Sequence, residues 1–139
     1  FRQQRAILAA VEKRFESTLY DIQQMVQGDL FDSDLDAAKE LLKNKFIRAS
    51  GAICGVVLEK HLKLVCDTHS VSLGRKKGTI GNLNYALKAA GVIDTPQWRF
   101  IHHLGDIRNL CDHDNDEEPT KEQVSDLNQG VSKITKTLF

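Results

Sequence analysis

The chain of 139 residues has the length of one domain that can bury a hydrophobic core. Hydrophobic residues make up 41% and charged residues 27%, near the averages for globular proteins, so the composition excludes a disordered chain. The 19 lysines and arginines balance the 19 aspartates and glutamates. This neutrality excludes a broadly basic protein that coats nucleic acid and a polybasic membrane-binding patch, although it allows a local basic site.

The three cysteines, Cys54, Cys66 and Cys111, include no C-x-x-C pair. In one predicted helix, the stretch from Cys54 to Cys66 spans about 18 Å, which is too far for a disulfide. We therefore expect reduced thiols and a cytoplasmic protein. Since no apolar run reaches the length of a membrane span, we expect no membrane contact. The chain begins at Phe1 and its only methionine is Met25, so we interpret it as part of a longer protein.

The first half of the chain is predicted to form two long helices. Apolar residues at steps of three and four predict an amphipathic helix over residues 4–27, with Gly28 as its end. Its apolar stripe consists of Ile7, Leu8, Val11, Phe15, Leu19, Ile22, Met25 and Val26. Ser33 is predicted to cap a second helix that continues to about His69. A bend is expected near Gly51 and Gly55, where the missing side chains would also let another helix approach closely.

A loop over residues 70–78 separates this pair from a short helix that Thr79 caps and that ends near Gly91. Thr95 is predicted to cap the next helix, with Pro96 at the first helical position, where its missing N–H costs nothing. This fourth helix is expected to end within residues 112–115.

The last predicted helix follows Pro119. Thr120 and Gln123 have the spacing of a capping box, and a clean apolar stripe at steps of three and four continues to Leu138. No segment shows the alternation of a strand. The predicted fold is therefore all-α, a four-helix up-and-down bundle with one extra short helix, in a single domain over residues 1–139.

The fourth predicted helix ends in the sequence Arg108-Asn109-Leu110-Cys111-Asp112-His113. At about 100° per residue, Arg108 lies at the edge of the apolar face and Asn109 on the polar side. A guanidinium at the edge of a core requires a partner or a wet cleft, and Glu59 is the candidate partner. In a continuous helix, His113 would lie about 140° from Arg108. The two share a site only if the helix ends before His113, which the following residues DNDEEP favour, or if a second subunit completes the site.

This sequence resembles the motif of the HEPN family. In that family, an arginine is followed by a polar residue and, a few positions later, by a histidine at the end of a helix, in an all-α domain of this length. The resemblance rests on residues 108–113 and on the helical layout across most of the chain. It implies a bundle that dimerises along the motif helix and a metal-independent endoribonuclease of toxin or antiphage-defence type. The implied partners are RNA, a second copy of the chain and a sensor or regulatory domain in the same or another chain; no cofactor or metal is implied.

The resemblance makes Arg108, Asn109 and His113 the predicted catalytic residues. His113 would transfer protons because imidazole titrates near neutral pH, and Arg108 would hold the phosphate oxygens as charge develops. Asn109 would orient the phosphate or His113. The RNA 2′-hydroxyl would attack the adjacent phosphate and leave a 2′,3′-cyclic phosphate. The loop residues that would contact further RNA phosphates are Arg75, Lys76 and Lys77.

Each of these residues also has a purely structural interpretation. Arg108 is able to pair with Glu59 or a neighbouring carboxylate, and His113 to stabilise a helix C-terminus. Asn109 and the basic loop fit an ordinary solvated surface, and a metal site around His102 lacks zinc-ligand spacing. The alternatives are a catalytically inactive HEPN-like module that dimerises or binds a partner or nucleotide, and an unrelated helical interaction domain.

Overall fold

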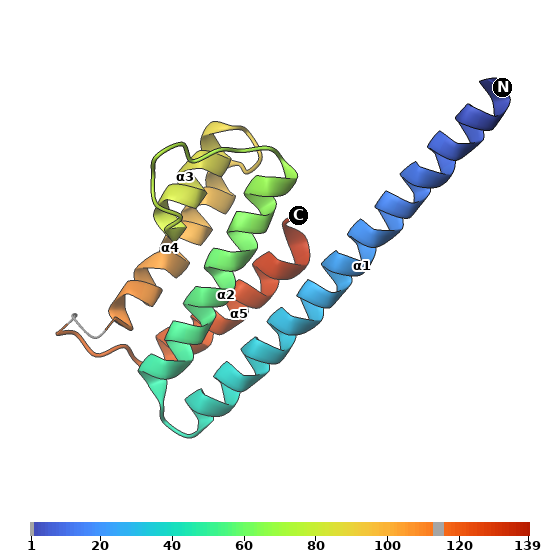
Figure 1. Ribbon diagram of the computed structural model, residues 1–139. Helices are drawn as coiled ribbons and strands as arrows, with labels where there is room; N and C mark the ends of the chain where they lie inside the picture. Colours follow the sequence, from blue (N-terminus) through green and yellow to red (C-terminus); the bar gives the residue numbers. More distant parts are fainter. Residues whose placement is uncertain (1, 113–115) are drawn as a thin grey trace.

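A computed structural model of the chain describes residues 2–112 and 116–139. Within these residues the fold is helical throughout, with no strand. The elements are α1 (Arg2–Lys43), α2 (Ile47–Thr68), α3 (Ile80–Ala89), α4 (Thr95–Leu110) and α5 (Lys121–Thr137). The four longer helices alternate in direction along the chain, and the short α3 packs on α2 and α4 (Figure 1). The prediction of an all-helical bundle is therefore confirmed for the described residues.

Helix α1 is longer than predicted because neither Gly28 nor Ser33 interrupts it. A glycine inside a helix costs about 1 kcal/mol relative to alanine, which does not end a helix whose next turns are well packed. Beyond Gly28, α1 buries Phe31 and Leu35 against the bundle. The predicted end at Gly28 and the predicted start at Ser33 are both wrong.

The long second helix predicted over residues 33–69 is interrupted by a turn. The N–H of Phe46 donates to the carbonyl of Leu41 (2.9 Å), and the N–H of Lys45 donates to that of Leu42 (3.1 Å). Lys45 has a positive φ of 70°, so this pair of bonds closes α1 as a Schellman motif. The apolar spacing continues unbroken through the turn, which is why periodicity alone predicted one helix. Asn44, a residue often found at helix ends, was the local signal of the break.

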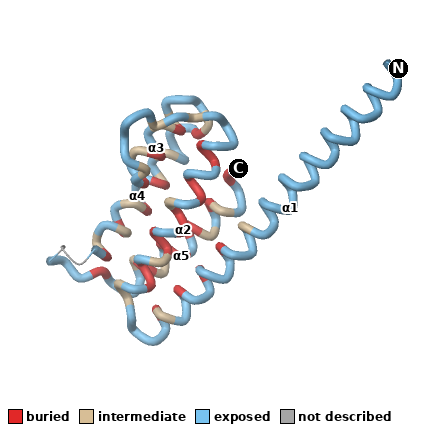
Figure 2. Tube along the Cα trace, viewed as in Figure 1, coloured by how far each residue is buried: buried red, intermediate tan, exposed pale blue. Residues whose placement is uncertain are grey.

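The core lies between α2, α3, α4, α5 and the C-terminal half of α1. Its fully buried side chains include Leu58, Leu62, Leu83, Leu104 and Leu127. The N-terminal half of α1 extends beyond the bundle, and residues 2–26 are all exposed (Figure 2). Most of the apolar stripe predicted over residues 4–27 thus packs against nothing in the described chain.

The other helices begin at or within one residue of the positions that the sequence predicts. The Thr79 side chain accepts from the N–H of Asn82, and Thr120 forms the predicted capping box with Gln123. At α4, the cap is Asp94 rather than Thr95, since its carboxylate accepts from the N–H of Gln97 (2.8 Å) and completes a capping box. Pro96 accordingly occupies the second helical position. Within the described residues, no helix combines the length and apolar character that crossing a bilayer requires.

Candidate functional site

The site is built where α4 comes close to α2. A Cβ added to Gly55 would lie 2.5 Å from Cγ of Arg108, and one added to Gly51 would overlap Sγ of Cys111. The predicted close approach of another helix at these glycines is therefore confirmed. The aliphatic stem of Arg108 lies directly on Gly55, so the position of the guanidinium depends on the missing side chain there.

Arg108 and Asn109 line a cavity of about 320 Å³ between α2, α3 and α4. The predicted supporting residue Glu59 lines it as well. Asn84 links α3 to α4 beside the cavity, because its side-chain amide donates to the main-chain carbonyl of Trp98 (2.9 Å). The other lining residues are Thr79, Ile80, Gly81, His102, Gly105 and Asp106.

The charged groups of the cavity form local ion pairs. Nη1 of Arg108 lies 3.3 Å from Oδ2 of Asp112, and the Arg108 side chain is 35% exposed. Glu59 is paired with Lys63 at 3.0 Å. Among the described residues, Asp112 and not Glu59 is the hydrogen-bond partner of Arg108. Because a half-exposed pair contributes only about 0–1 kcal/mol, Asp112 leaves the guanidinium available to a stronger anionic ligand.

The N-terminus of α3 forms one wall of this cavity. Thr79 accepts from the N–H of Asn82, whereas Ile80 and Gly81 begin the first turn at the cavity. The unpaired N–H groups and the dipole of a helix N-terminus favour an anion. The cavity thus combines a helix N-terminus with a guanidinium, and both favour phosphate oxygens.

The predicted catalytic residue His113 lies outside the described residues. The end of the preceding helix is described: α4 ends at Leu110, earlier than predicted, and Cys111 is its C-terminal cap. The helix therefore ends before position 113. This was the condition under which the sequence allows His113 and Arg108 to share one site.

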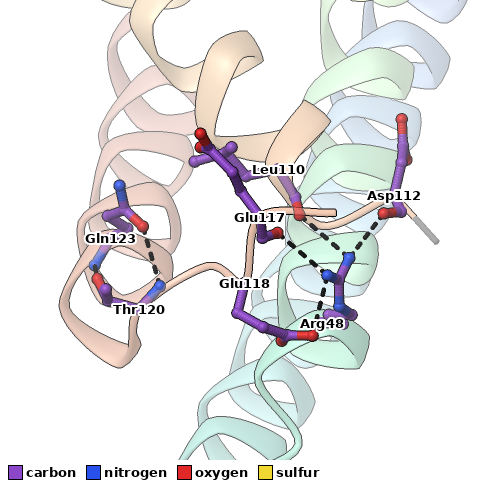
Figure 3. A network of polar contacts seen from close by, with 7 residues as sticks. All are labelled: Arg48, Leu110, Asp112, Glu117, Glu118, Thr120 and Gln123. Atoms are coloured by element: carbon purple, nitrogen blue, oxygen red, sulfur yellow. Dashed lines mark hydrogen bonds and ion pairs between the residues drawn. The ribbon is translucent and has the colours of Figure 1, made fainter. Parts of the chain in front are cut away.

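Arg48, which the sequence analysis did not single out, holds both ends of the segment that follows α4. Its Nη1 donates to the main-chain carbonyls of Leu110 (3.2 Å) and Asp112 (2.6 Å). Its Nη2 donates to the carbonyl of Glu117 (3.1 Å) and to the carboxylate of Glu118 (3.1 Å), as Figure 3 shows. Arg48 thus links the start of α2 to the chain on either side of residues 113–115.

A signal for Arg48 existed in the sequence once the turn before α2 is known. Arg48 is the second residue of α2, and a cation in the first turn of a helix is disfavoured by the helix dipole. Such a residue needs acceptors from elsewhere in the fold. In the long helix predicted over residues 33–69, position 48 lies in the interior, where this conflict does not arise.

The basic loop of Arg75, Lys76 and Lys77 is exposed between α2 and α3. Nζ of Lys76 lies 5.1 Å from the centre of the Tyr85 ring. None of the three residues lines the cavity that contains Arg108. Among the described residues, the structure therefore does not bring the predicted phosphate contacts into one site with Arg108 and Asn109.

The three cysteines are free and buried. Burial raises the pKa of the Cys54 thiol to about 11, and it also raises the pKa of Cys111, which lies just after the motif helix. A raised pKa keeps the thiol protonated and unreactive at neutral pH. Cys111 therefore packs as a buried thiol against Gly51.

Comparison with known protein families, with curated proteins and with solved structures gives no match for this chain. Membership of the HEPN family stays a prediction that rests on residues 108–113 and on the helical layout.

Proposed function

We propose that the chain is a metal-independent endoribonuclease domain of HEPN type, the effector of a toxin or antiphage-defence system. One observation carries the proposal: Arg108 lies on Gly55 and lines a cavity of about 320 Å³, which the N-terminus of α3 lines as well, and the ion pair with Asp112 holds Arg108 only weakly. A cavity of this size lies at the lower end of the range for small-molecule sites and is large enough for a phosphodiester and a neighbouring group.

In the proposed reaction, Arg108 exchanges Asp112 for the oxygens of the scissile phosphate. The RNA 2′-hydroxyl gives up its proton to His113 or to water and attacks the phosphorus, while the 5′-oxygen leaves and takes up a proton. Arg108 and the first N–H groups of α3 stabilise the charge that develops on the phosphorane. Asn109 orients the phosphate or His113, and Arg48 positions the segment that carries His113.

The test is cleavage of a fluorescent single-stranded RNA by the 139-residue chain in EDTA. We expect products with 2′,3′-cyclic phosphate ends, and a loss of about 100-fold or more in Arg108→Ala and His113→Ala. The matched control is Arg99→Ala, which removes an exposed arginine from the same helix outside the cavity. Equal rates in all four proteins, or no cleavage by any folded one, would rule out the assignment.

A second experiment distinguishes a catalytic role of Arg108 from a structural role. Asp112→Asn keeps the carbonyl that accepts from Arg48 but removes the carboxylate that pairs with Arg108. If Arg108 binds phosphate, Asp112→Asn should bind RNA several-fold more tightly, since a competing negative charge is gone. Unchanged affinity would favour a structural ion pair.

The alternative is a catalytically inactive HEPN-like module that dimerises or binds a partner or nucleotide, and the exposed apolar half of α1 favours it. RNA or nucleotide binding without cleavage, lost in Arg108→Ala, would support this function. Dimerisation along the motif helix stays a prediction. Helix α4 carries no exposed large hydrophobic residue, whereas α1 carries many.

A further inference from the structure

The part of α1 that extends beyond the bundle exposes a continuous apolar stripe. Its members recur at steps of three and four and are each 44% to 64% exposed. The stripe consists of Leu8, Val11, Phe15, Leu19, Ile22, Val26 and Leu30. A contiguous apolar face of this length on a helix marks a surface that binds another molecule.

The bundle of the same chain cannot cover this stripe. With Phe31 set at 0° and about 100° per residue, the buried residues of α1 centre near 10° and the stripe near 210°. The hydrogen bonds on the α2 side of this part of α1 are made by polar groups: the hydroxyl of Tyr20 lies 3.3 Å from that of Thr68, and Gln24 donates to Tyr20. The stripe therefore needs an occupant from outside the bundle.

The stripe is close to palindromic about Leu19. Reversing the helix direction places Ile22 opposite Phe15, Val26 opposite Val11, and Leu30 opposite Leu8, each within about one residue of register. A surface that matches its own reverse suits an isologous interface, in which two copies are related by a two-fold axis.

The charges on α1 also match in the antiparallel direction. Residues 2–14 contain four basic residues and one acidic residue, whereas residues 15–36 contain six acidic residues and no basic one. An antiparallel pair centred on Leu19 sets Arg5 of one copy at the level of Asp34 of the other, and both residues lie on the same flank of the stripe. A parallel pair would place like charges together, which opposes association.

We propose that two copies of the chain pair antiparallel through this stripe of α1, with the two-fold axis at Leu19. The two bundles then lie at opposite ends of the helix pair. The cavity between α2, α3 and α4 stays open in each copy, because α1 packs on the other side of α2 (Figure 1). The pairing depends neither on the proposed nuclease activity nor on contacts through α4.

Sedimentation equilibrium of the 139-residue chain tests the pairing. We expect twice the 15.6 kDa of one chain at micromolar concentration, and a dissociation constant at least 10-fold higher for Phe15→Glu and for Ile22→Glu. The matched control is Ser17→Glu, which adds the same charge on the opposite side of the exposed segment and should still dimerise. A monomeric wild type, or a dimer that Phe15→Glu leaves intact, would overturn the proposal.

Charge reversal tests the direction of the pair. Arg5→Glu should weaken the dimer, and adding Asp34→Lys should restore it, because the reversed charges meet again. Added salt should weaken the wild-type dimer by screening these attractions. A dimer that salt strengthens, or that Asp34→Lys fails to rescue, would exclude the antiparallel arrangement.

Discussion

At the scale of single residues, Arg48 is the side chain that connects several segments of the chain by hydrogen bonds. Its guanidinium binds main-chain carbonyls on both sides of residues 113–115 and the carboxylate of Glu118, and its own side chain is 21% exposed. Hydrogen bonds to carbonyls fix the course of a loop irrespective of the side chains that the loop carries. Arg48 therefore determines where the segment with the predicted His113 leaves and re-enters the bundle.

Replacing Arg48 by methionine keeps the aliphatic stem and removes these bonds. We expect the free energy of unfolding to fall by about 2 kcal/mol, as for other charged hydrogen-bond donors. Urea denaturation measures this loss, and proteolysis should become faster within residues 112–118. Arg75→Met, in an exposed loop, should change stability by no more than about 0.5 kcal/mol. An equal change in both variants would contradict this role of Arg48.

At the scale of helices, two glycines in helix interiors have opposite roles. Nothing lies within 4 Å of the Cβ position of Gly28 in α1, whereas the same position at Gly55 in α2 is occupied by the stem of Arg108. Gly28 therefore only lowers helix propensity, whereas Gly55 sets the distance between α2 and α4.

Alanine substitutions should separate these roles. Gly28→Ala should raise the free energy of unfolding by about 1 kcal/mol through helix propensity. Gly55→Ala should lower it by about 1–3 kcal/mol, since the added methyl group displaces Arg108 or the whole of α4. Thermal and urea unfolding of the two variants check the opposite signs. If Gly55→Ala were also stabilising, the close packing at Arg108 would be wrong.

At the scale of the whole molecule, His61 couples overall stability to pH. Its ring is buried against Phe31, and Nε2 lies 2.7 Å from the carbonyl of Leu138, at the end of α5. Burial lowers the pKa of His61 below its usual 6.5. The neutral ring donates to Leu138 and so joins α2 to the last turn of α5.

The sign of the pH effect follows from the lowered pKa. As pH falls below about 6.5, the unfolded chain takes up a proton at His61 that the folded chain does not bind, so stability is complete above this pH and declines below it. His61→Gln should retain less stability at pH 7.5 but lose less of it between pH 7.5 and pH 5.5. Urea unfolding at both values, with the exposed His103→Gln as control, tests this; equal losses in wild type and His61→Gln would contradict it.

Local sequence patterns were enough to predict the helical character of the chain, the caps at Thr79 and Thr120, and the close approach at Gly51 and Gly55. These features depend on residues within about one helical turn along the chain or on the absence of a side chain, so they can be predicted from the local sequence. It also identified Arg108 as a side chain at the edge of the core, and that prediction required only helical periodicity.

Contacts between distant segments set the continuation of α1 through Gly28, the pairing of Arg108 with Asp112, and the bonds made by Arg48. The turn at residues 44–46 has only Asn44 as a local signal. Apolar periodicity is unchanged across a tight turn that keeps the same face buried, so it could not reveal the break. Which carboxylate meets Arg108, and which carbonyls meet Arg48, depends on how distant segments pack. Such contacts are set by the three-dimensional arrangement of the helices and not by spacing along the chain.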